Sequence, residues 1–296
     1  MRRMMQKCIR NFISSNSHSA LLLVDIGAWP FHDLLEKYPK RAKNIGIFEP
    51  GTISLAAGLS LSGIIPIVYG ISPFIAQRSL EQIKLDFAYQ KTGGNFLVTG
   101  ASYDFSALGY SHYCPEDVIT LSTIPGVEIV TPGTPSQFET LWKDCHANSN
   151  PTYFRMTDHC NTKECSVEFG KAAVLKRGTM GCVICAAETM DKVMAAAKEL
   201  DVTVLYYTTI VPFDSETLQN EIADIPKRIY LCTPFYKGSI TANVVNALKG
   251  AEYGIEESGV PLEILRNYGT KDEKDCYCGL SLEQISRSMK SFFYGK

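Results

Sequence analysis

Short apolar runs recur through the first half of the chain, with helical or turn-forming segments between them. Near-continuous apolar strands that alternate with helices are typical of a parallel sheet covered on both faces. We therefore predict an α/β arrangement for this part of the chain. The predicted strands lie in ALLLVDIG, IIPIVYGI, NFLVTGA, VEIVTPG and TYFRMT.

The alternation stops in a polar stretch, residues 159–181, and then resumes. Such an interruption indicates a crossover between domains. We predict two α/β domains with mostly parallel sheets, a first over residues 1–165 and a smaller second over residues 166–296. The second domain has predicted strands in CVICAA, VTVLYY and RIYLCT, and helices in MDKVMAAAKEL, DSETLQNEI and SITANVVNALKG, with a last helix over 282–293.

Two helices in the first domain follow from apolar spacing. Met5, Cys8, Ile9 and Phe12 fall at i, i+3, i+4 and i+7, which predicts an N-terminal amphipathic helix. The same segment has no acidic residue, as in an organelle presequence, and this alternative stays open.

A further helix is predicted from about Phe74 to Tyr89. Its inward stripe is Leu80, Ile83 and Phe87, and Arg78 lies on its polar face.

Composition narrows the function classes. The 296 residues carry 29 Lys and Arg against 31 Asp and Glu, for a net charge of -2. This balance gives no electrostatic reason to expect nucleic acid or an anionic membrane as partner. No apolar run reaches the roughly 18 residues that a membrane span needs. We expect a cytoplasmic protein that acts on a small molecule.

The ten cysteines are scattered and are predicted to be free thiols. Cys182 and Cys185 form a C-x-x-C pair, but in a strand side chains three apart point to opposite faces and cannot share a metal. Cys276 and Cys278 have no second pair or histidine nearby. We therefore predict no metal site within this chain.

Glu49 is the only carboxylate in the stretch NIGIFEPGTISLAAGLSLSG, residues 44–63. Pro50 suits the first turn of a helix, so Glu49 is expected at a helix start in an apolar environment. A structural explanation is available, because the helix dipole favours an acid there by about 0.3–1 kcal/mol.

Six motifs in one order give Glu49 a second explanation. Together they resemble the pyrimidine-binding domain of transketolases and deoxyxylulose-phosphate synthases, and VTVLYYTTIVPFDSETL resembles the family's C-terminal domain, so the resemblance covers nearly the whole chain. The six are NIGIFE, SLAAGLSLSGIIPIV, SPFIAQRSLEQIKLDFAYQ, GYSHYCPEDV, IPGVEIVTPGTP and PTYFRM.

The resemblance implies thiamine diphosphate as cofactor and a catalytic role for Glu49. In this family the matching glutamate hydrogen-bonds ring nitrogen N1′ of the aminopyrimidine. A proton at N1′ favours the imino form of the ring, whose 4′ nitrogen then removes the proton from thiazolium C2. Alanine could not support this proton transfer, and glutamine could only hydrogen-bond.

Three further positions match motif residues of the family. Phe74 matches the aromatic that stacks on the aminopyrimidine. Gln77 lies where many transketolases have a second aromatic, so part of that wall is expected to be missing. His112, in GYSH, matches a catalytic histidine that faces the substrate and assists proton movements. A core phenylalanine and a structural histidine are the alternatives.

The substrate positions depart from the family. Arg155, in YFRM, matches an arginine near the substrate channel, with an ion pair as the alternative. Tyr103 lies near the place of an upstream histidine, and Asp158 stands where a basic residue is common. An acid facing a phosphate opposes binding by about 1 kcal/mol or more. We expect an acceptor other than an ordinary pentose phosphate, such as an unphosphorylated or nucleotide-linked sugar, unless Asp158 turns away or the partner supplies cations.

The sequence contains no G-D-G motif, with which this family holds the diphosphate through a divalent metal. The resemblance therefore implies a partner, the diphosphate-binding transketolase subunit, which would supply most of the Mg²⁺ contacts in an α2β2 heterotetramer. The expected function is ketol transfer by a split transketolase. A β subunit of a 2-oxo acid dehydrogenase and a catalytically silent assembly subunit remain alternatives.

Overall fold

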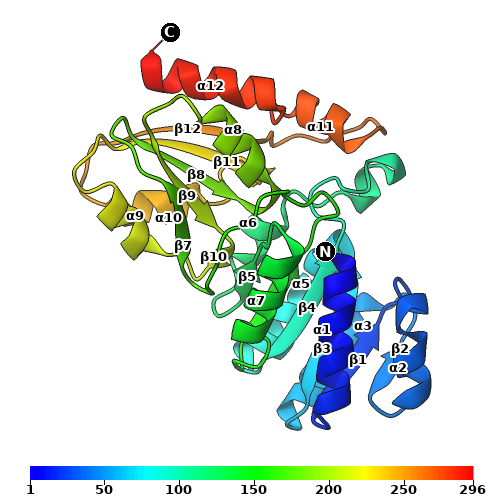
Figure 1. The fold of residues 1–296 in the computed structure, drawn as a ribbon. Coiled ribbons are helices and arrows are strands. Elements are labelled where there is room, and N and C mark those ends of the chain that lie inside the picture. Colours follow the sequence, from blue (N-terminus) through cyan, green and yellow to red (C-terminus); the bar gives the residue numbers. More distant parts are fainter. Residues whose placement is uncertain (296) are drawn as a thin grey trace.

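The computed structural model describes residues 1–295 and contains two sheets, each flanked by helices (Figure 1). The first sheet has seven strands in the order β10-β5-β6-β4-β3-β1-β2, and the second has five in the order β12-β11-β8-β9-β7. Most neighbouring strands are parallel, as the apolar runs predict. The predicted α/β fold with two mostly parallel sheets is confirmed.

The first sheet takes six strands from residues 19–155 and a seventh, β10, from residues 209–211. The last of these strands, β10, pairs antiparallel with β5 at the sheet edge, so the chain returns to the first sheet after crossing to the second. The seven strands are β1 (Ser19–Leu23), β2 (Ala42–Asn44), β3 (Ile65–Ile71), β4 (Gly94–Thr99), β5 (Glu128–Val130), β6 (Pro151–Arg155) and β10 (Thr209–Val211).

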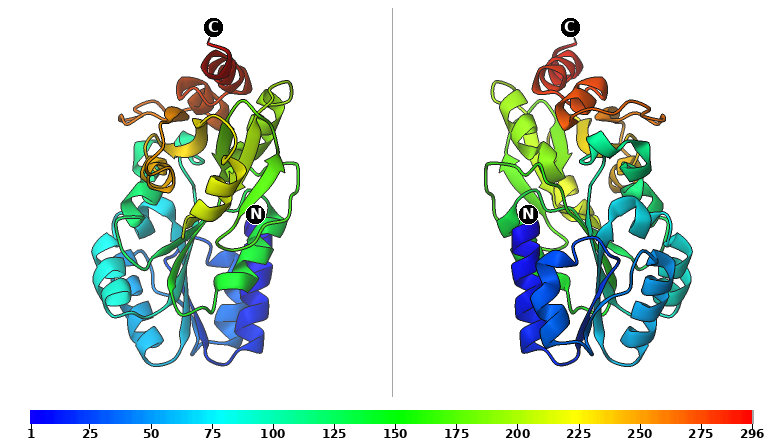
Figure 2. Two further views of the ribbon diagram at one scale, coloured as in Figure 1. Left: turned by 90° about the vertical axis from the view of Figure 1, so that its left-hand side faces the viewer. Right: turned by 90° about the vertical axis from the view of Figure 1, so that its right-hand side faces the viewer.

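Helices cover both faces of the first sheet (Figure 2). Strand β1 shows the reason, because Leu21 and Leu23 pack in one apolar cluster and Leu22 in another. The first cluster includes α1 (Arg2–Ser15), α2 (His32–Lys37) and α7 (Pro135–Cys145), and the second includes α3 (Glu49–Leu61), α4 (Ser72–Ala76) and α6 (Asp117–Leu121).

The predicted N-terminal helix is present as α1, and Met5, Cys8 and Ile9 are buried as expected. Ile13 completes the buried stripe, whereas Phe12 is half-buried and packs edge-on against Trp142. Among the residues described, no helix is long and apolar enough to cross a membrane.

The predicted continuous helix over 74–89 is wrong. Helix α4 ends at Ala76, a turn follows, and the chain resumes as the short α5 (Leu80–Gln82) and a π-helical segment, Ile83–Tyr89. Ile83 and Phe87 are buried as predicted. The apolar spacing identifies the buried face but not the break.

The second sheet contains a strand in the stretch predicted to be a crossover. Strand β7 pairs antiparallel with β9 at the edge of the sheet. The boundary at residue 165 lies between β6 and β7 and stays a prediction. The strands of this sheet are β7 (Ala172–Lys176), β8 (Cys182–Ala186), β9 (Thr203–Tyr207), β11 (Arg228–Tyr236) and β12 (Gly254–Val260).

Strand β8 confirms the prediction for its cysteines. Cys182 packs in the apolar cluster on one face of the sheet and Cys185 in the cluster on the other. Within residues 1–295 all ten cysteines are free thiols. One face carries α8 (Met190–Ala196) and α12 (Leu282–Tyr294), and the other carries α9 (Ser215–Glu221) and α10 (Thr241–Ala247), while α11 (Lys271–Tyr277) precedes α12.

Candidate functional site

The predicted cofactor and catalytic residues follow three parallel strands of the first sheet, β2, β3 and β4, with β1 between β2 and β3. Glu49 begins α3 after β2, Phe74 lies in α4 after β3, and His112 lies in the loop after β4. In α/β folds, ligands bind outside the carboxyl ends of parallel strands. The topology therefore brings three segments that are distant in sequence to one edge.

Glu49 is buried, with 2% of its side chain exposed, and it is the first residue of α3. Its environment is not the apolar one expected from the sequence. The Arg78 guanidinium donates from Nη1 to Glu49 Oε2 at 2.7 Å. Arg78 is 44% exposed, so this ion pair joins a buried carboxylate to a cation that is open to water.

Phe74 extends the contact from Arg78 to His112. The Arg78 Cζ atom lies 4.2 Å from the centroid of the half-buried Phe74 ring. On another side, the Phe74 and His112 rings meet edge to face with centroids 5.4 Å apart. Glu49, Arg78, Phe74 and His112 thus form one continuous group, which we call the Glu49 cluster.

Gln77 is exposed in the turn between α4 and α5 and donates through Nε2 to Glu116 Oε1. Its amide therefore faces the loop before α6, and its predicted place beside the aminopyrimidine stays a prediction. The other Glu116 oxygen is buried without a hydrogen-bond partner among the residues described. Burial raises the pKa of Glu116.

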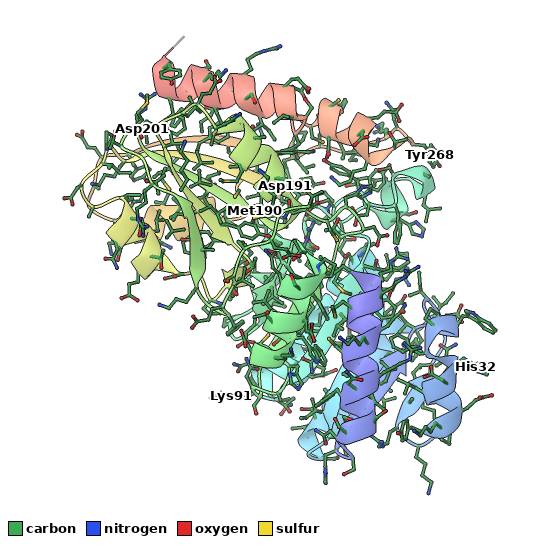
Figure 3. The ribbon with its side chains drawn as sticks, viewed as in Figure 1. His32, Lys91, Met190, Asp191, Asp201 and Tyr268 are labelled. Carbon is green, nitrogen blue, oxygen red and sulfur yellow. The ribbon has the colours of Figure 1, made fainter. Side chains whose placement is uncertain are left out.

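His112 closes a 3₁₀ turn, Tyr110–His112, and its Nδ1 lies 3.1 Å from Ser111 Oγ. The second domain supports this loop. A Cβ on Gly109 would lie 2.6 Å from the Tyr268 ring, so Gly109, at φ +83°, allows that ring to approach closely. Figure 3 shows Tyr268 beside this segment. The position of His112 therefore depends on contact between the domains.

Arg155 is 1% exposed and pairs with Asp117, which is fully buried, at 2.9 Å from Nε to Oδ2. Its Nη2 donates to Ser102 Oγ at 2.6 Å, and its Cζ lies 4.7 Å from the Phe235 ring centroid. The ion-pair alternative is therefore observed, in the interior. A substrate contact by Arg155 stays a prediction and would require these partners to open.

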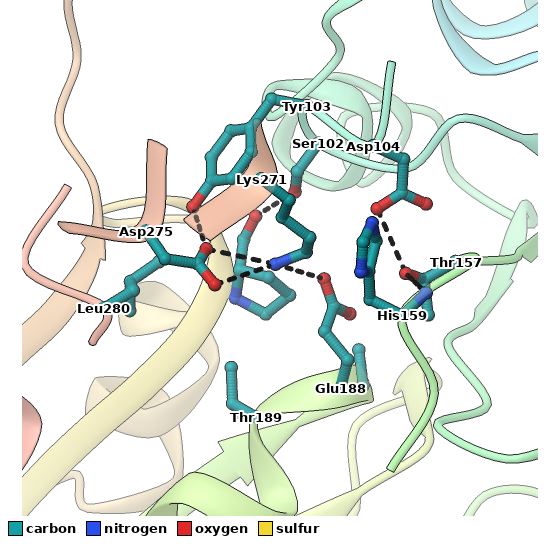
Figure 4. A network of polar contacts seen from close by, with 12 residues as sticks. Ser102, Tyr103, Asp104, Thr157, His159, Glu188, Thr189, Lys271, Asp275 and Leu280 are labelled. Atoms are coloured by element: carbon teal, nitrogen blue, oxygen red, sulfur yellow. Dashed lines mark hydrogen bonds and ion pairs between the residues drawn. The ribbon is translucent and has the colours of Figure 1, made fainter. Parts of the chain in front are cut away.

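Tyr103 also lies in the interior, in a group of polar residues between the domains (Figure 4). Its hydroxyl donates to Asp275 Oδ1 at 2.6 Å, and Asp275 also accepts from Lys192 at 2.6 Å and from Lys271 at 3.0 Å. These contacts occupy Tyr103, so its predicted substrate role stays a prediction. We name Tyr103, Asp104, Glu188, Lys192, Lys271 and Asp275 the interdomain cluster.

Two carboxylates of the interdomain cluster, Glu188 and Asp104, lie in surroundings that stabilise a negative charge poorly. Glu188 is 8% exposed, and within residues 1–295 neither of its oxygens accepts a hydrogen bond. Glu188 forms an ion pair with Lys271, whose Nζ lies 3.9 Å from Glu188 Oε1. Burial, and then the nearby charge of Glu188, raise the pKa of Asp104 to about 7. Of this cluster, the resemblance in sequence points only to Tyr103.

The Asp158 carboxylate pairs with Arg2 of α1. The Asp158 backbone N–H donates a hydrogen bond to Asp104 Oδ2 at 2.9 Å. Arg2 also donates to Thr99 Oγ1 at 3.0 Å and lies 5.5 Å from the Phe105 ring centroid. Arg2 thus engages the Asp158 carboxylate, and the place of Asp158 facing a substrate stays a prediction.

The Glu49 cluster fits one half of thiamine diphosphate. A buried carboxylate beside a half-buried aromatic ring is the pair of groups that an aminopyrimidine needs, one to bond a ring nitrogen and one to stack. Among the residues described, no group of three or more His, Cys, Asp or Glu side chains could hold a metal ion.

Known proteins share both the sequence and the fold. Residues 17–159 match the family described as transketolase, pyrimidine binding domain. The chain is 32% identical over 282 residues to an uncharacterized 33.6 kDa protein in the fasciation locus of Rhodococcoides fascians, covering 95% of this chain and 90% of that protein. It is 28% identical over 276 residues to a subunit of the apulose-4-phosphate transketolase of Phocaeicola vulgatus, covering 90% and 88%.

Among solved structures, a split gene transketolase described as an inactive beta4 tetramer superposes with a TM-score of 0.84 at 21% identity. The superposition covers 99% of this chain and 97% of that one. At this identity the match establishes the fold, and it extends over both sheets.

Proposed function

Because this chain belongs to the transketolase family, with its pyrimidine-binding domain at residues 17–159, we propose that it is the pyrimidine-binding subunit of a two-chain transketolase. The enzyme would use thiamine diphosphate to transfer a two-carbon ketol unit between sugars or sugar derivatives. The observation that carries the proposal is the Glu49 cluster, in which Arg78 links Glu49 to Phe74 and the Phe74 ring contacts His112.

Each residue of the cluster has a distinct task in this proposal. Thiamine diphosphate supplies the thiazolium carbon C2 that accepts the two-carbon unit. Glu49 would hold a proton at ring nitrogen N1′, and its burial protects that hydrogen bond from water. Phe74 would orient the ring by stacking. His112, whose ring contacts Phe74 edge to face, would move protons at the sugar hydroxyl groups.

The partner would be the diphosphate-binding transketolase subunit, which brings the residues for Mg²⁺ and the diphosphate. The missing G-D-G motif supports this division. The names of similar proteins also support it, since one is a single subunit of a larger transketolase and another is an inactive tetramer of beta chains. We propose an α2β2 heterotetramer in which neither chain is active alone.

The acceptor is proposed to differ from an ordinary pentose phosphate. The support is electrostatic, because Asp117 already neutralises Arg155 and Asp158 already neutralises Arg2. A phosphate would have to displace these carboxylates or find cations on the partner. The relative named for apulose 4-phosphate suggests a phosphorylated sugar substrate as the competing possibility.

The function is tested by reconstituting the chain with the diphosphate-binding subunit and screening acceptors with a common ketose donor. Turnover that requires both chains supports the proposal. A complex that assembles with bound cofactor yet transfers no ketol unit to any acceptor would contradict it. Efficient use of ribose 5-phosphate would reject only the altered acceptor.

A further inference from the structure

We propose that Arg78 is a latch that occupies the aminopyrimidine position in the free subunit and must leave before the cofactor can bind. The inference depends on the proposed function, because it assumes that Glu49 and Phe74 receive the aminopyrimidine. It assigns a role to Arg78, which lies in the same motif as Phe74 but receives no role from the resemblance.

The Arg78 side chain makes both contacts that the aminopyrimidine is expected to make. It donates an N–H to Glu49 Oε2 at 2.7 Å, and its Cζ lies 4.2 Å from the Phe74 ring centroid. A guanidinium is planar, binds carboxylates and lies well over aromatic rings. One planar group therefore bonds the buried acid and covers the ring, and the proposal is that the aminopyrimidine takes the same place.

Burial explains why Glu49 needs such a substitute. A carboxylate with 2% exposure and no partner would carry a large desolvation cost, which the Arg78 charge offsets. Without it the free subunit would hold an uncompensated acid at the edge of its sheet. Arg78 is thus suited to hold Glu49 until another donor replaces it.

The backbone around Arg78 allows the side chain to leave. Arg78 lies in the turn between α4 and α5, shortly before the π-helical segment. Irregular helical turns of this kind are frequent at functional sites. The side chain is 44% exposed, so it can swing into water without opening the core. Its neighbour Gln77 is tied separately to Glu116 and can hold the turn in place.

A latch multiplies the intrinsic affinity for the aminopyrimidine by the fraction of molecules in which the latch is open. If Arg78 leaves Glu49 free in about one molecule in ten, its removal should raise the affinity about tenfold. A residue that assists binding would give the opposite sign. The direction of the change therefore separates the two roles.

The test titrates the ¹⁵N-labelled full chain with thiamine, which carries the aminopyrimidine but no diphosphate. Two-dimensional NMR follows the arginine Nε–Hε signals. We expect thiamine to shift the Arg78 signal to that of a free arginine, and Arg78→Met to bind thiamine about tenfold more tightly than wild type.

Arg10 provides a matched control, because it pairs with Asp33 at 3.0 Å and lies 5.4 Å from the Phe31 ring centroid. Its signal should not respond, and Arg10→Met should leave the affinity for thiamine unchanged. The latch is contradicted if Arg78→Met binds thiamine as weakly as wild type or more weakly.

Two further variants separate failure of the latch from failure of the proposed function. In the Arg78→Met background, Phe74→Ala and Glu49→Gln should each weaken thiamine binding. If they do so while Arg78→Met gives no gain by itself, the latch is wrong and the cofactor site stands. If neither changes the affinity, thiamine binds elsewhere and both proposals fail.

Discussion

The two ion pairs Glu49–Arg78 and Asp117–Arg155 join the same kinds of group in different surroundings. In the first, the carboxylate is 2% exposed and the arginine 44%. In the second, both side chains are buried, at 0% and 1%, and Arg155 has Ser102 and Phe235 as further partners. The first pair can exchange its arginine for another donor, whereas the second cannot open without exposing the interior.

This difference separates the proposed binding site from a contact that holds domains together. The Glu49 cluster lies at the carboxyl edge of the first sheet and presents half-buried rings. Arg155 instead contacts Phe235 of β11, a strand of the second sheet. The interdomain cluster extends the same junction through Tyr103 and Asp275.

The largest expected effect is on proton exchange at C2 of bound thiamine diphosphate. Glu49→Ala should slow this exchange by roughly 10²–10⁴-fold in the assembled enzyme, because no group then protonates N1′. Deuterium exchange followed by NMR provides the measurement. Glu283→Ala removes an exposed first-turn carboxylate from α12 and should leave the rate unchanged. Exchange at the wild-type rate in Glu49→Ala would mean that Glu49 is only a helix-start acid.

The next largest effect is on stability at the buried pair. Asp117→Asn leaves the Arg155 charge uncompensated in the interior and should lower the free energy of unfolding by about 3–5 kcal/mol. Urea unfolding checks this value. Arg177→Met breaks a surface pair, with Arg177 71% exposed, and should have little effect. Equal losses of unfolding free energy in Asp117→Asn and Arg177→Met would show that the buried pair contributes no more than a surface pair.

The interdomain cluster should make stability depend on pH. The pKa of Asp104 is raised from 3.8 to about 7, so between these values the folded chain holds a proton that the unfolded chain has released. This group's contribution to the free energy of unfolding therefore falls as pH rises through that range. Glu188→Gln removes the nearby negative charge, which is the second cause of the raised Asp104 pKa, and should weaken the pH dependence of stability.

Thermal unfolding of the wild type and Glu188→Gln at about pH 5 and about pH 8 tests this effect. The wild type should lose more stability than the variant between the two conditions. Parallel losses would show that Glu188 does not act on Asp104.

The smallest stability effect is expected at the open pair. Arg78→Met should cost about 1–3 kcal/mol, because the buried Glu49 carboxylate loses a partner but the arginine that is removed is 44% exposed. Urea unfolding beside Asp117→Asn provides the comparison. A loss as large as that of Asp117→Asn would make Arg78 a structural residue and argue against its displacement by a cofactor.

The regular parts of the fold can be predicted because their signals are local. The spacing in α1 and the alternation across β8 each occur within one element, and both are confirmed. Strand β7 escapes prediction because its five residues lie in a polar stretch and are only half-buried. The pairing of β10 with β5 joins residues far apart in sequence, which no local pattern records.

The candidate site can be predicted only in part for the same reason. Motif order points to Glu49, Phe74 and His112, and the topology places them together. Arg78 has the pattern of an ordinary residue on the polar face of a helix, because nothing in its spacing reveals the break after Ala76. Tyr103 and Asp275 lie 172 positions apart, so their contact depends on how the two domains pack.

Calorimetric titration of thiamine diphosphate with Mg²⁺ tests most directly whether this chain supplies only the pyrimidine half of a shared cofactor site. The full chain alone should show no micromolar binding, and the chain mixed with the diphosphate-binding subunit should bind tightly with one cofactor per pair of chains. Micromolar binding to the isolated chain would contradict the shared site, because this chain would then hold the diphosphate and metal without a partner.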